Sequence, residues 1–251
     1  MEPTKVLSHE RPSGQEIRPD RVEAAFWAGI ARNVATTAET KDTGAVPVAG
    51  GYAVVVQGSG LAIALGIGTR RPLRADDLQT IAAFFAERGL EPRIELAADV
   101  YERDGAMLAE AGYRLEGRLG VYARDPVGTL PAPDLPPVAG LKRAAWIGAF
   151  GAPLEANAAH ALTAIRGDDG ELVAGAAVAV NGDTALILFL AGVPGPAASS
   201  ALVTGLAAGQ ARGATRALLK LADEDPLIDT ARANGFAVAE QRYRLAIPAA
   251  V

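Results

Sequence analysis

The residues best suited to chemistry lie between Ala191 and Ala208, where an apolar run leads into a helix-like pattern. The stretch reads AGVPGPAASSALVTGLAA, so glycines, other small residues and two serines meet at this junction. The start of a helix offers backbone N–H groups without helical partners and the positive end of the helix dipole. Such a junction can hold an anion, above all a phosphate, where no large side chain keeps it from the backbone.

Other reaction centres find little support in the sequence. The chain has no cysteine, which excludes disulfides, thiolate nucleophiles and cysteine-bound metals. Its two histidines, His9 in an N-terminal tail and His160 in a predicted alanine-rich helix (EANAAHALTAI), have no carboxylates at metal-binding spacing. We therefore predict no metal site. The hydrolase motif G-x-S-x-G does not occur.

The composition is that of a folded chain outside the membrane. Half of the 251 residues are hydrophobic and 21% are charged. A net charge of −5 argues against a general nucleic-acid surface. No uninterrupted apolar run reaches the roughly 18 residues of a membrane span, and the start lacks the apolar core of a signal peptide. We expect a cytoplasmic protein without membrane or nucleic-acid partners; the sequence leaves its oligomeric state open.

A proline-rich segment divides the chain near its midpoint. Residues 125–140 (DPVGTLPAPDLPPVAG) contain five prolines, a density that disfavours helices and sheet interiors. The predicted organisation is a tail over residues 1–19, one domain over 20–124, a linker over 125–140 and a second domain over 141–251.

The two halves repeat the same order of patterns. Each is predicted to contain a helix with a tryptophan (Trp27 or Trp146), a hairpin, a second helix, a strand, a short helix and a final strand. The second hairpin turns at Asn181-Gly182, a strong hairpin signal, and the first at Gly58. Glycines at matching places separate the elements of each half: Gly58 and Gly182, Gly89 and Gly213, and Gly112 and Gly235.

Cap residues and periodicity indicate where the helices begin and which residues form the strands. Asp76 or Asp77 is expected to cap the second helix of the first half, and Ser199 or Ser200 its counterpart. Asp225 before Pro226 is expected to cap the short helix of the second half. The strands after these helices are expected at RIELA and ALLKL, and the final strands at RLEGRLGVYAR and AVAEQRYRLAI.

This order of elements, ending in a short helix, Gly-aromatic and a final strand, resembles the GNAT superfamily of N-acetyltransferases. Two copies with a linker resemble tandem GNAT proteins. The resemblance implies an α+β fold with two GNAT-like domains, each a mixed, mostly antiparallel sheet flanked by helices. It also implies that acetyl-CoA, as co-substrate, lies in a V-shaped opening between the fourth and fifth strands. Backbone N–H groups of the following strand-to-helix turn would hold its pyrophosphate.

The resemblance assigns cofactor binding to the second half. The GNAT turn reads Q/R-x-x-G-x-G/A, and this chain departs from it with Pro194 at the first position and Ala197 at the first glycine. The residues placed at the cofactor are Ala191, Val193, Gly195, Ala197, Ala198, Ser199, Ser200 and Asn234.

The corresponding turn of the first half is Arg70-Arg71-Pro72-Leu73-Arg74-Ala75. Its three arginines could meet the anionic groups of coenzyme A. The same arginines beside Asp76 and Asp77 are also typical of a solvated basic corner, and this second interpretation is favoured.

The catalytic groups are not fixed by the sequence. The tyrosine that many GNAT enzymes use as general acid is missing from the segment before Asn234. Asp183 is a candidate base and Tyr243 a candidate acid, but a turn aspartate and a packing tyrosine explain them as well.

Two functions are consistent with these observations. The first is acetyl-CoA-dependent transfer of an acetyl group to an amine of a small molecule or peptide. The second is a non-catalytic GNAT-like module that binds a ligand or serves assembly, with a degenerate coenzyme A turn.

Overall fold

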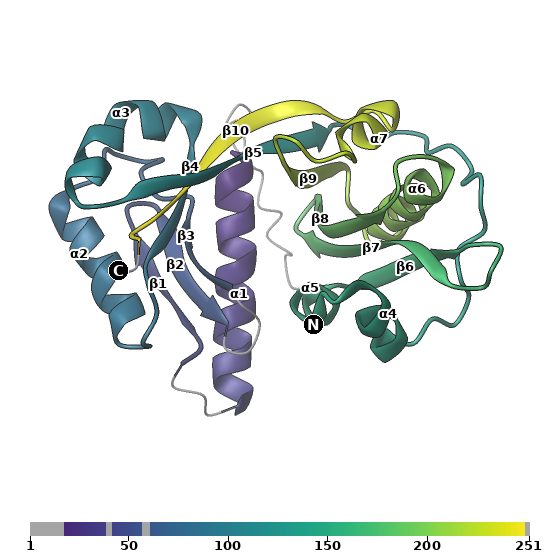
Figure 1. Ribbon diagram of the computed structural model, residues 1–251, viewed down its shortest axis with the longest axis horizontal. Coiled ribbons are helices and arrows are strands. Elements are labelled where there is room, and N and C mark those ends of the chain that lie inside the picture. The colour runs from purple at the N-terminus through teal and green to yellow at the C-terminus, as the bar shows by residue number, and fades with distance from the viewer. Residues whose placement is uncertain (1–17, 39–41, 57–60, 249–251) are drawn as a thin grey trace, which may run out of the picture.

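The computed structural model describes residues 18–38, 42–56 and 61–248. Their strands form one ten-stranded sheet in the order β1-β2-β3-β4-β10-β5-β9-β8-β7-β6. The pairs β3–β4 and β8–β9 are parallel and the remaining pairs are antiparallel. Helices flank this sheet in two lobes (Figure 1). The predicted mixed, mostly antiparallel fold is confirmed.

The first half contains the predicted elements and one additional edge strand, β1. Pro47 lies in this strand, and an edge position tolerates proline because one side of the strand needs no ladder partner. The elements are α1 (Pro19–Ala38), β1 (Gly44–Val48), β2 (Gly51–Val56), β3 (Leu61–Leu65), α2 (Ala75–Ala86), β4 (Arg93–Ala97), α3 (Ala98–Glu110) and β5 (Arg114–Arg124).

The second half repeats this order after two short helices. The predicted helix over EANAAHALTAI is wrong, because a helix ends at Ala158 and a strand begins at Ala161. Pairing with the next strand overrides the helix propensity of alanine here. The elements are α4 (Arg143–Phe150), α5 (Pro153–Ala158), β6 (Ala161–Arg166), β7 (Leu172–Asn181), β8 (Thr184–Gly192), α6 (Pro196–Gln210), β9 (Arg216–Ala222), α7 (Ile228–Ala233) and β10 (Ala237–Ala246).

Turns and caps agree with the sequence in part. The Asn181-Gly182 hairpin is confirmed, with Gly182 at φ 62° and Asn181 paired to Thr184. Asp77 accepts a hydrogen bond from the Arg74 N–H, as a residue of the first turn rather than as the N-cap. Asp225 receives the Leu227 N–H in the turn before α7, so it does not cap that helix directly. The predicted turn at Gly58 lies outside the described residues.

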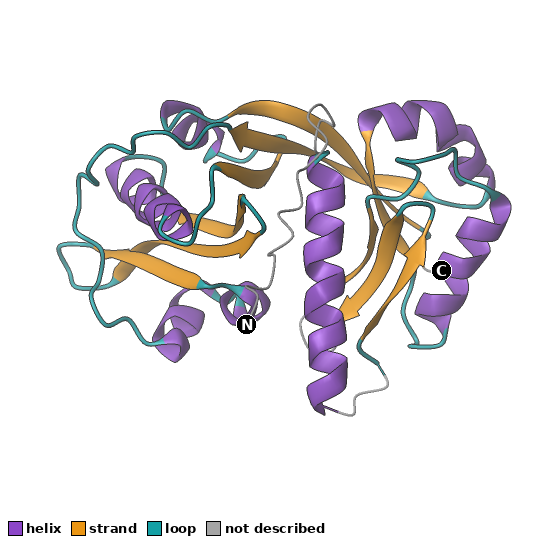
Figure 2. Cartoon of the chain, turned by 180° about the vertical axis from the view of Figure 1, so that it is seen from behind, coloured by secondary structure: helices purple, strands orange, loops and turns teal. Residues whose placement is uncertain are grey.

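The final strand of each half pairs with the other half. β5 pairs with β9, and β10 pairs with β4. β5 and β10 also pair with each other at the centre of the sheet. The repeat predicts one sheet per half; the reciprocal exchange of final strands instead makes a single continuous sheet. Figure 2 shows these long strands running from one lobe into the other.

Helix α1 stands between the two lobes (Figure 1). Its buried face, which includes Trp27, shares one apolar cluster with Leu154 of α5, Leu186 of β8 and Leu218 of β9. Helices α2 and α3 pack with the sheet of the first lobe in a second cluster, and α6 and α7 do so in the second lobe. The side of the sheet that carries α1 is therefore shared by both halves.

The strand exchange predicts that neither half folds alone. A chain cut after residue 124 separates β4 from β10 and β5 from β9, which leaves unpaired sheet edges in each fragment. We expect fragments 1–124 and 125–251 to lack cooperative thermal unfolding singly and to form a folded one-to-one complex when coexpressed. Circular dichroism and gel filtration measure both. Either fragment melting cooperatively as a monomer would contradict the exchange.

Candidate active site

Strands β8 and β9 run side by side and then separate. Their parallel pairing extends from Thr184↔Arg216 to Ile187↔Leu219. Beyond this point β8 stays with β7 and β9 stays with β5. The facing edges of the two strands thus open into a V, named here the β8–β9 notch. Backbone groups along such an edge lack ladder partners and can bind an extended ligand.

A β-bulge lies where the two strands separate. The register of β7 with β8 shifts between Ala177↔Phe189 and Val178↔Ile187, so Leu188 is the extra residue. A bulged residue is left out of the ladder. The bulge therefore lies at the base of the β8–β9 notch and leaves Leu188 outside the β7–β8 ladder.

Helix α6 follows β8 and starts one turn earlier than predicted. It begins at Pro196 with Gly195 as its N-cap, so the predicted cap at Ser199 or Ser200 is wrong. Proline suits the first helical position because its φ is already fixed near the helical value. Gly195 has a φ of 142°, a backbone conformation that glycine adopts without a side-chain clash.

The first turn of α6 presents open backbone donors. Its first hydrogen bond runs from Ser199 N to Gly195 O (3.0 Å), which leaves the N–H groups of Ala197 and Ala198 outside the helical ladder. A Cβ built on Gly195 would meet nothing within 4 Å. This corner therefore combines two N–H donors, the positive helix end and free space.

The other predicted cofactor residues differ in what they contact. Asn234 Nδ2 donates to Ser199 Oγ (3.0 Å), which brings together an amide on the end of α7 and a hydroxyl on α6. Ala191 is half-buried on β8 within the notch, and Val193 is 80% exposed. Ser200 Oγ accepts a hydrogen bond from Leu135 N (3.0 Å), so its side chain holds the linker. The side chain of Ala198 is buried.

The corresponding corner of the first half is filled by its own carboxylates. Asp104 Oδ2 accepts the Leu73 N–H (3.0 Å), and Asp77 Oδ2 accepts the Arg74 N–H (2.9 Å). Arg71 binds Asp77 through two contacts of 2.7 Å. The N–H groups of Leu73 and Arg74 are thus occupied, and the two carboxylates would repel a phosphate at this corner. This ion-paired corner agrees with the favoured interpretation of the sequence.

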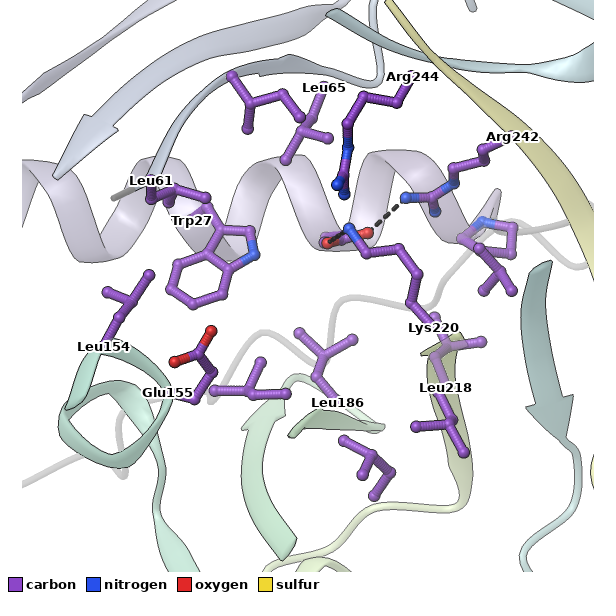
Figure 3. A pocket seen from close by; sticks show the side chains of 17 residues that line it. Trp27, Leu61, Leu65, Leu154, Glu155, Leu186, Leu218, Lys220, Arg242 and Arg244 are labelled. Carbon is purple, nitrogen blue, oxygen red and sulfur yellow. Dashed lines mark hydrogen bonds and ion pairs between the residues drawn. The ribbon is translucent and has the colours of Figure 1, made fainter. Parts of the chain in front are cut away.

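A cavity of about 220 Å³ lies between the halves on the side of α1. It reaches the base of the β8–β9 notch, because its walls include Ile187 and Leu188 of β8 and Leu219 and Lys220 of β9. The remaining walls come from both halves, and Figure 3 shows their side chains converging on one space, named here the central pocket.

Solved structures with a similar fold match most of the chain. A GCN5-related N-acetyltransferase from Kribbella flavida is 22% identical, with 89% of this chain and 96% of that chain covered and a TM-score of 0.57. Another from Sphaerobacter thermophilus is 16% identical, with 80% and 78% covered and a TM-score of 0.59. The chain has the GNAT fold.

The tandem arrangement is also found among these structures. A tandem GNAT protein from the clavulanic acid biosynthesis pathway is 14% identical, with 92% of this chain and 95% of that chain covered and a TM-score of 0.56. The predicted duplication of the GNAT unit is therefore confirmed. No protein-family model and no curated protein matches the sequence.

A buried ion cluster closes one end of the central pocket of this GNAT fold. Glu95 of β4 has a fully buried side chain and contacts Lys220 Nζ (3.1 Å), Arg242 Nη1 (2.9 Å) and Arg244 Nη2 (3.2 Å). Glu23 of α1 contacts Lys220 (2.6 Å) and Arg242. The cluster therefore joins α1 and β4 of the first half to β9 and β10 of the second.

The cations of this cluster lower the pKa of two of its carboxylates, Glu95 and Glu23. Burial alone would raise the pKa of Glu95, but Lys220 and Arg242 outweigh it and lower that pKa to about 2. The same balance lowers the pKa of Glu23. Burial raises the pKa of Glu240, whose carboxylate contacts Arg242 Nε.

Glu155 is a candidate base that the sequence does not reveal. It lies on α5 in the wall of the central pocket, and Figure 3 shows its carboxylate beside Trp27. Within the described part of the chain, no hydrogen bond or ion pair involves this carboxylate. The sequence places Glu155 in a helix, as observed, but contains no signal that this helix lies beside α1 in the wall of the pocket.

The two catalytic candidates from the sequence lie elsewhere. Asp183 is in the β7–β8 turn, at the opposite end of β8 from the notch, where it contacts Arg216 (3.7 Å) and accepts the Thr184 hydroxyl (3.1 Å). The ring of Tyr243 stacks on Tyr101 with centroids 4.3 Å apart, in the core of the first lobe. Both have the structural roles that the sequence left open as alternatives.

Among the described residues, no group of three or more histidine, aspartate and glutamate side chains could hold a metal ion. Of the helices in the described ranges, none combines the length and hydrophobicity that a membrane span requires.

The ion cluster predicts acid sensitivity. The pKa of Glu95 in the folded state, about 2, lies below its ordinary value of 4.5, so Glu95 contributes stability above pH 4.5 that is lost as the pH falls toward 2. We expect this group to account for roughly 3 kcal/mol of that loss. Urea unfolding between pH 7 and 2 measures it.

The matched variants are Glu95→Gln and Glu116→Gln. Removing the charge of Glu95 leaves only Glu23 and Glu240 to neutralise Lys220, Arg242 and Arg244, so the buried cluster gains an uncompensated positive charge. We expect the free energy of unfolding at pH 7 to fall by about 3–5 kcal/mol and its pH dependence to flatten. Glu116 forms a partly exposed ion pair with Arg93 (3.6 Å). The Glu116→Gln variant should therefore keep the wild-type dependence of the free energy of unfolding on pH. The same pH dependence of the free energy of unfolding in all three proteins would contradict the role assigned to Glu95.

Proposed function

We propose that this protein is an N-acyltransferase that transfers an acetyl group from acetyl-CoA to an amine of a small molecule or peptide. One observation carries the proposal: the β8–β9 notch and the central pocket meet at the Leu188 bulge. A ligand in the notch and a second ligand in the pocket would therefore approach each other at this bulge.

The second half supplies the residues that fit coenzyme A. The open N–H groups of Ala197 and Ala198 and the positive end of α6 suit its pyrophosphate. Ser199 and Asn234 add a hydroxyl and an amide at the same corner. The edges of the notch suit an extended chain with amide groups. Acetyl-CoA bound there would supply the activated acetyl group.

The corner of the first half does not fit the cofactor. The carboxylates of Asp77 and Asp104 hold the N–H groups of Leu73 and Arg74 and would repel a phosphate. We therefore infer a single cofactor site, which lies in the second half.

The residues of the pocket can carry out the remaining chemistry. The Leu188 N–H can stabilise negative charge that develops on a carbonyl oxygen, and such donors are among the largest contributions to catalysis of acyl transfer. Glu155 can accept the proton that an attacking amine must lose. Because acetyl transfer to an amine needs little more than these groups, the pocket does not require a metal or a covalent intermediate.

A second candidate function is a non-catalytic ligand-binding or assembly module. Pro194 and Pro196 lack N–H donors, and no arginine or glutamine stands at the start of the turn. These departures favour weaker cofactor binding. Binding of acetyl-CoA separates the two candidates directly.

Acetyl-CoA is expected to stabilise the folded protein. A ligand at 100 times its dissociation constant adds about 2.7 kcal/mol to the free energy of unfolding. Thermal unfolding with millimolar acetyl-CoA or coenzyme A measures this as a rise in Tm. No shift with either ligand would remove the enzymatic proposal and leave the second candidate.

A charge at the α6 corner should abolish that shift. Ser199→Glu places a carboxylate beside the proposed pyrophosphate site, whereas Ala75→Glu places one at the start of α2, where no cofactor is expected. We expect the rise in Tm to disappear in the first variant and to persist in the second. A shift that survives Ser199→Glu would place the cofactor elsewhere.

Glu155→Gln tests the proposed base. Loss of a general base lowers kcat by about 10²- to 10⁴-fold, while acetyl-CoA binding should remain. Coenzyme A release with a panel of amino acids and small amines measures the rate. Glu171→Gln, in the β6–β7 turn, is the matched control and should keep wild-type turnover. Unchanged kcat in Glu155→Gln would exclude it as the base.

A further inference from the structure

The two ends of the central pocket differ in chemistry. Figure 3 shows Glu155 and Trp27 on one side of the pocket and Lys220, Arg242 and Arg244 on the other. Apolar side chains lie between them, contributed by both halves: Leu61, Leu65, Leu154, Leu186 and Leu218. A ligand that fills this space would meet a carboxylate at one end and cations at the other.

Two guanidinium donors at the cationic end have no partner. Arg242 Nη2 and Arg244 Nε are buried and make no hydrogen bond with any described residue. The other two nitrogens of Arg242 are engaged, Nη1 with Glu23 and Glu95, and Nε with Glu240. A buried donor without a partner is costly, so native proteins rarely leave one unless a ligand or water satisfies it.

The two arginines that carry these donors line the same space. Arg242 and Arg244 are two residues apart on β10, so their side chains leave the same face of the sheet, and both line the central pocket. Arg242 is 1% exposed, which keeps its charge away from solvent screening. A carboxylate accepts two parallel N–H donors from guanidinium groups with good geometry.

We infer that the acceptor is a small amine that also carries a carboxylate, a compound of the amino-acid class, bound with its carboxylate at Arg242 and Arg244 and its amine at Glu155. The role of the amine rests on the proposed function; the recognition of the carboxylate does not.

Charge supports this assignment. The cluster contains three cations and three carboxylates (Glu23, Glu95 and Glu240), so the addition of one carboxylate does not meet a net negative field. At the other end, Glu155 and the face of Trp27 are both suited to an ammonium group.

The size of the pocket limits the ligand further. At about 220 Å³ it is smaller than the roughly 300–1,000 Å³ of pockets that hold drug-sized molecules. Leucine side chains line its middle. A single amino acid with an apolar body suits this space better than an extended peptide.

Matched ligands test the inference without any need for turnover. Leucine, 3-methylbutylamine, which lacks the carboxylate, and 4-methylpentanoate, which lacks the amine, are titrated into the full chain by calorimetry. We expect 3-methylbutylamine to bind at least tenfold more weakly than leucine to the wild-type protein. Equal affinities of these two ligands, or no detectable binding by either, would overturn the inference.

Two variants assign the ends of the pocket. Arg244→Leu should remove the preference for leucine over 3-methylbutylamine, and Glu155→Gln should weaken leucine but leave 4-methylpentanoate unchanged. Arg118→Leu is the control, since Arg118 lies over the ring of Tyr243 (5.5 Å) and outside the pocket. A preference that persists in Arg244→Leu would overturn the assignment of the carboxylate.

Failure of this inference differs from failure of the proposed function. Acetyl-CoA binding and acetylation of amines without preference for a carboxylate would overturn the inference and leave the function. Tight leucine binding that depends on Arg244, without any acetyl-CoA binding, would support the inference and remove the function.

Discussion

The carboxylate of Glu95 holds the two halves of this protein in one arrangement. It lies fully buried on β4 of the first half, and the cations that neutralise it, Lys220, Arg242 and Arg244, belong to β9 and β10 of the second. A buried charge is costly unless it is paired with good geometry. The exchanged strand β10 must therefore lie beside β4 in the register that brings Arg242 and Arg244 to Glu95. A slip of one residue would turn both arginines to the other face of the sheet.

The same constraint forms the central pocket. Because β10 crosses into the first lobe, α1 packs against strands of both halves, and Glu23 of α1 joins the ion cluster. The apolar walls then come from β3 on one side and from β8 and β9 on the other. Neither half contains the pocket by itself. The duplication thus provides more than a second copy of the fold, since the interface between the copies creates a space next to the β8–β9 notch.

Local patterns predicted most elements but not their partners. RIELA and RLEGRLGVYAR coincide with β4 and β5, because alternation and glycine stops are local signals. The exchange of β5 and β10 could not be predicted, since each final strand fits equally well beside its own half or the other. Glu155 was missed for a different reason: it is helical as predicted, but the packing of α5 against α1 and β8 is a long-range contact that no local pattern indicates. At α6, Pro196 was the signal for the earlier start, but the serines after it are stronger cap residues in general.

The two halves have diverged at the corner where the repeat predicts identical chemistry. In the first half, Asp77 and Asp104 accept the N–H groups of Leu73 and Arg74, so the turn is stable without a ligand. In the second half, Gly195 and Pro196 shape a helix start whose next two N–H groups stay open. The carboxylates of the first corner hold its own N–H groups and would repel an anion, whereas Ser199 and Asn234 at the second corner are neutral. The two halves therefore contribute different parts of the proposed site. The first half provides walls of the central pocket and charge partners for the ion cluster, and the second half provides the β8–β9 notch.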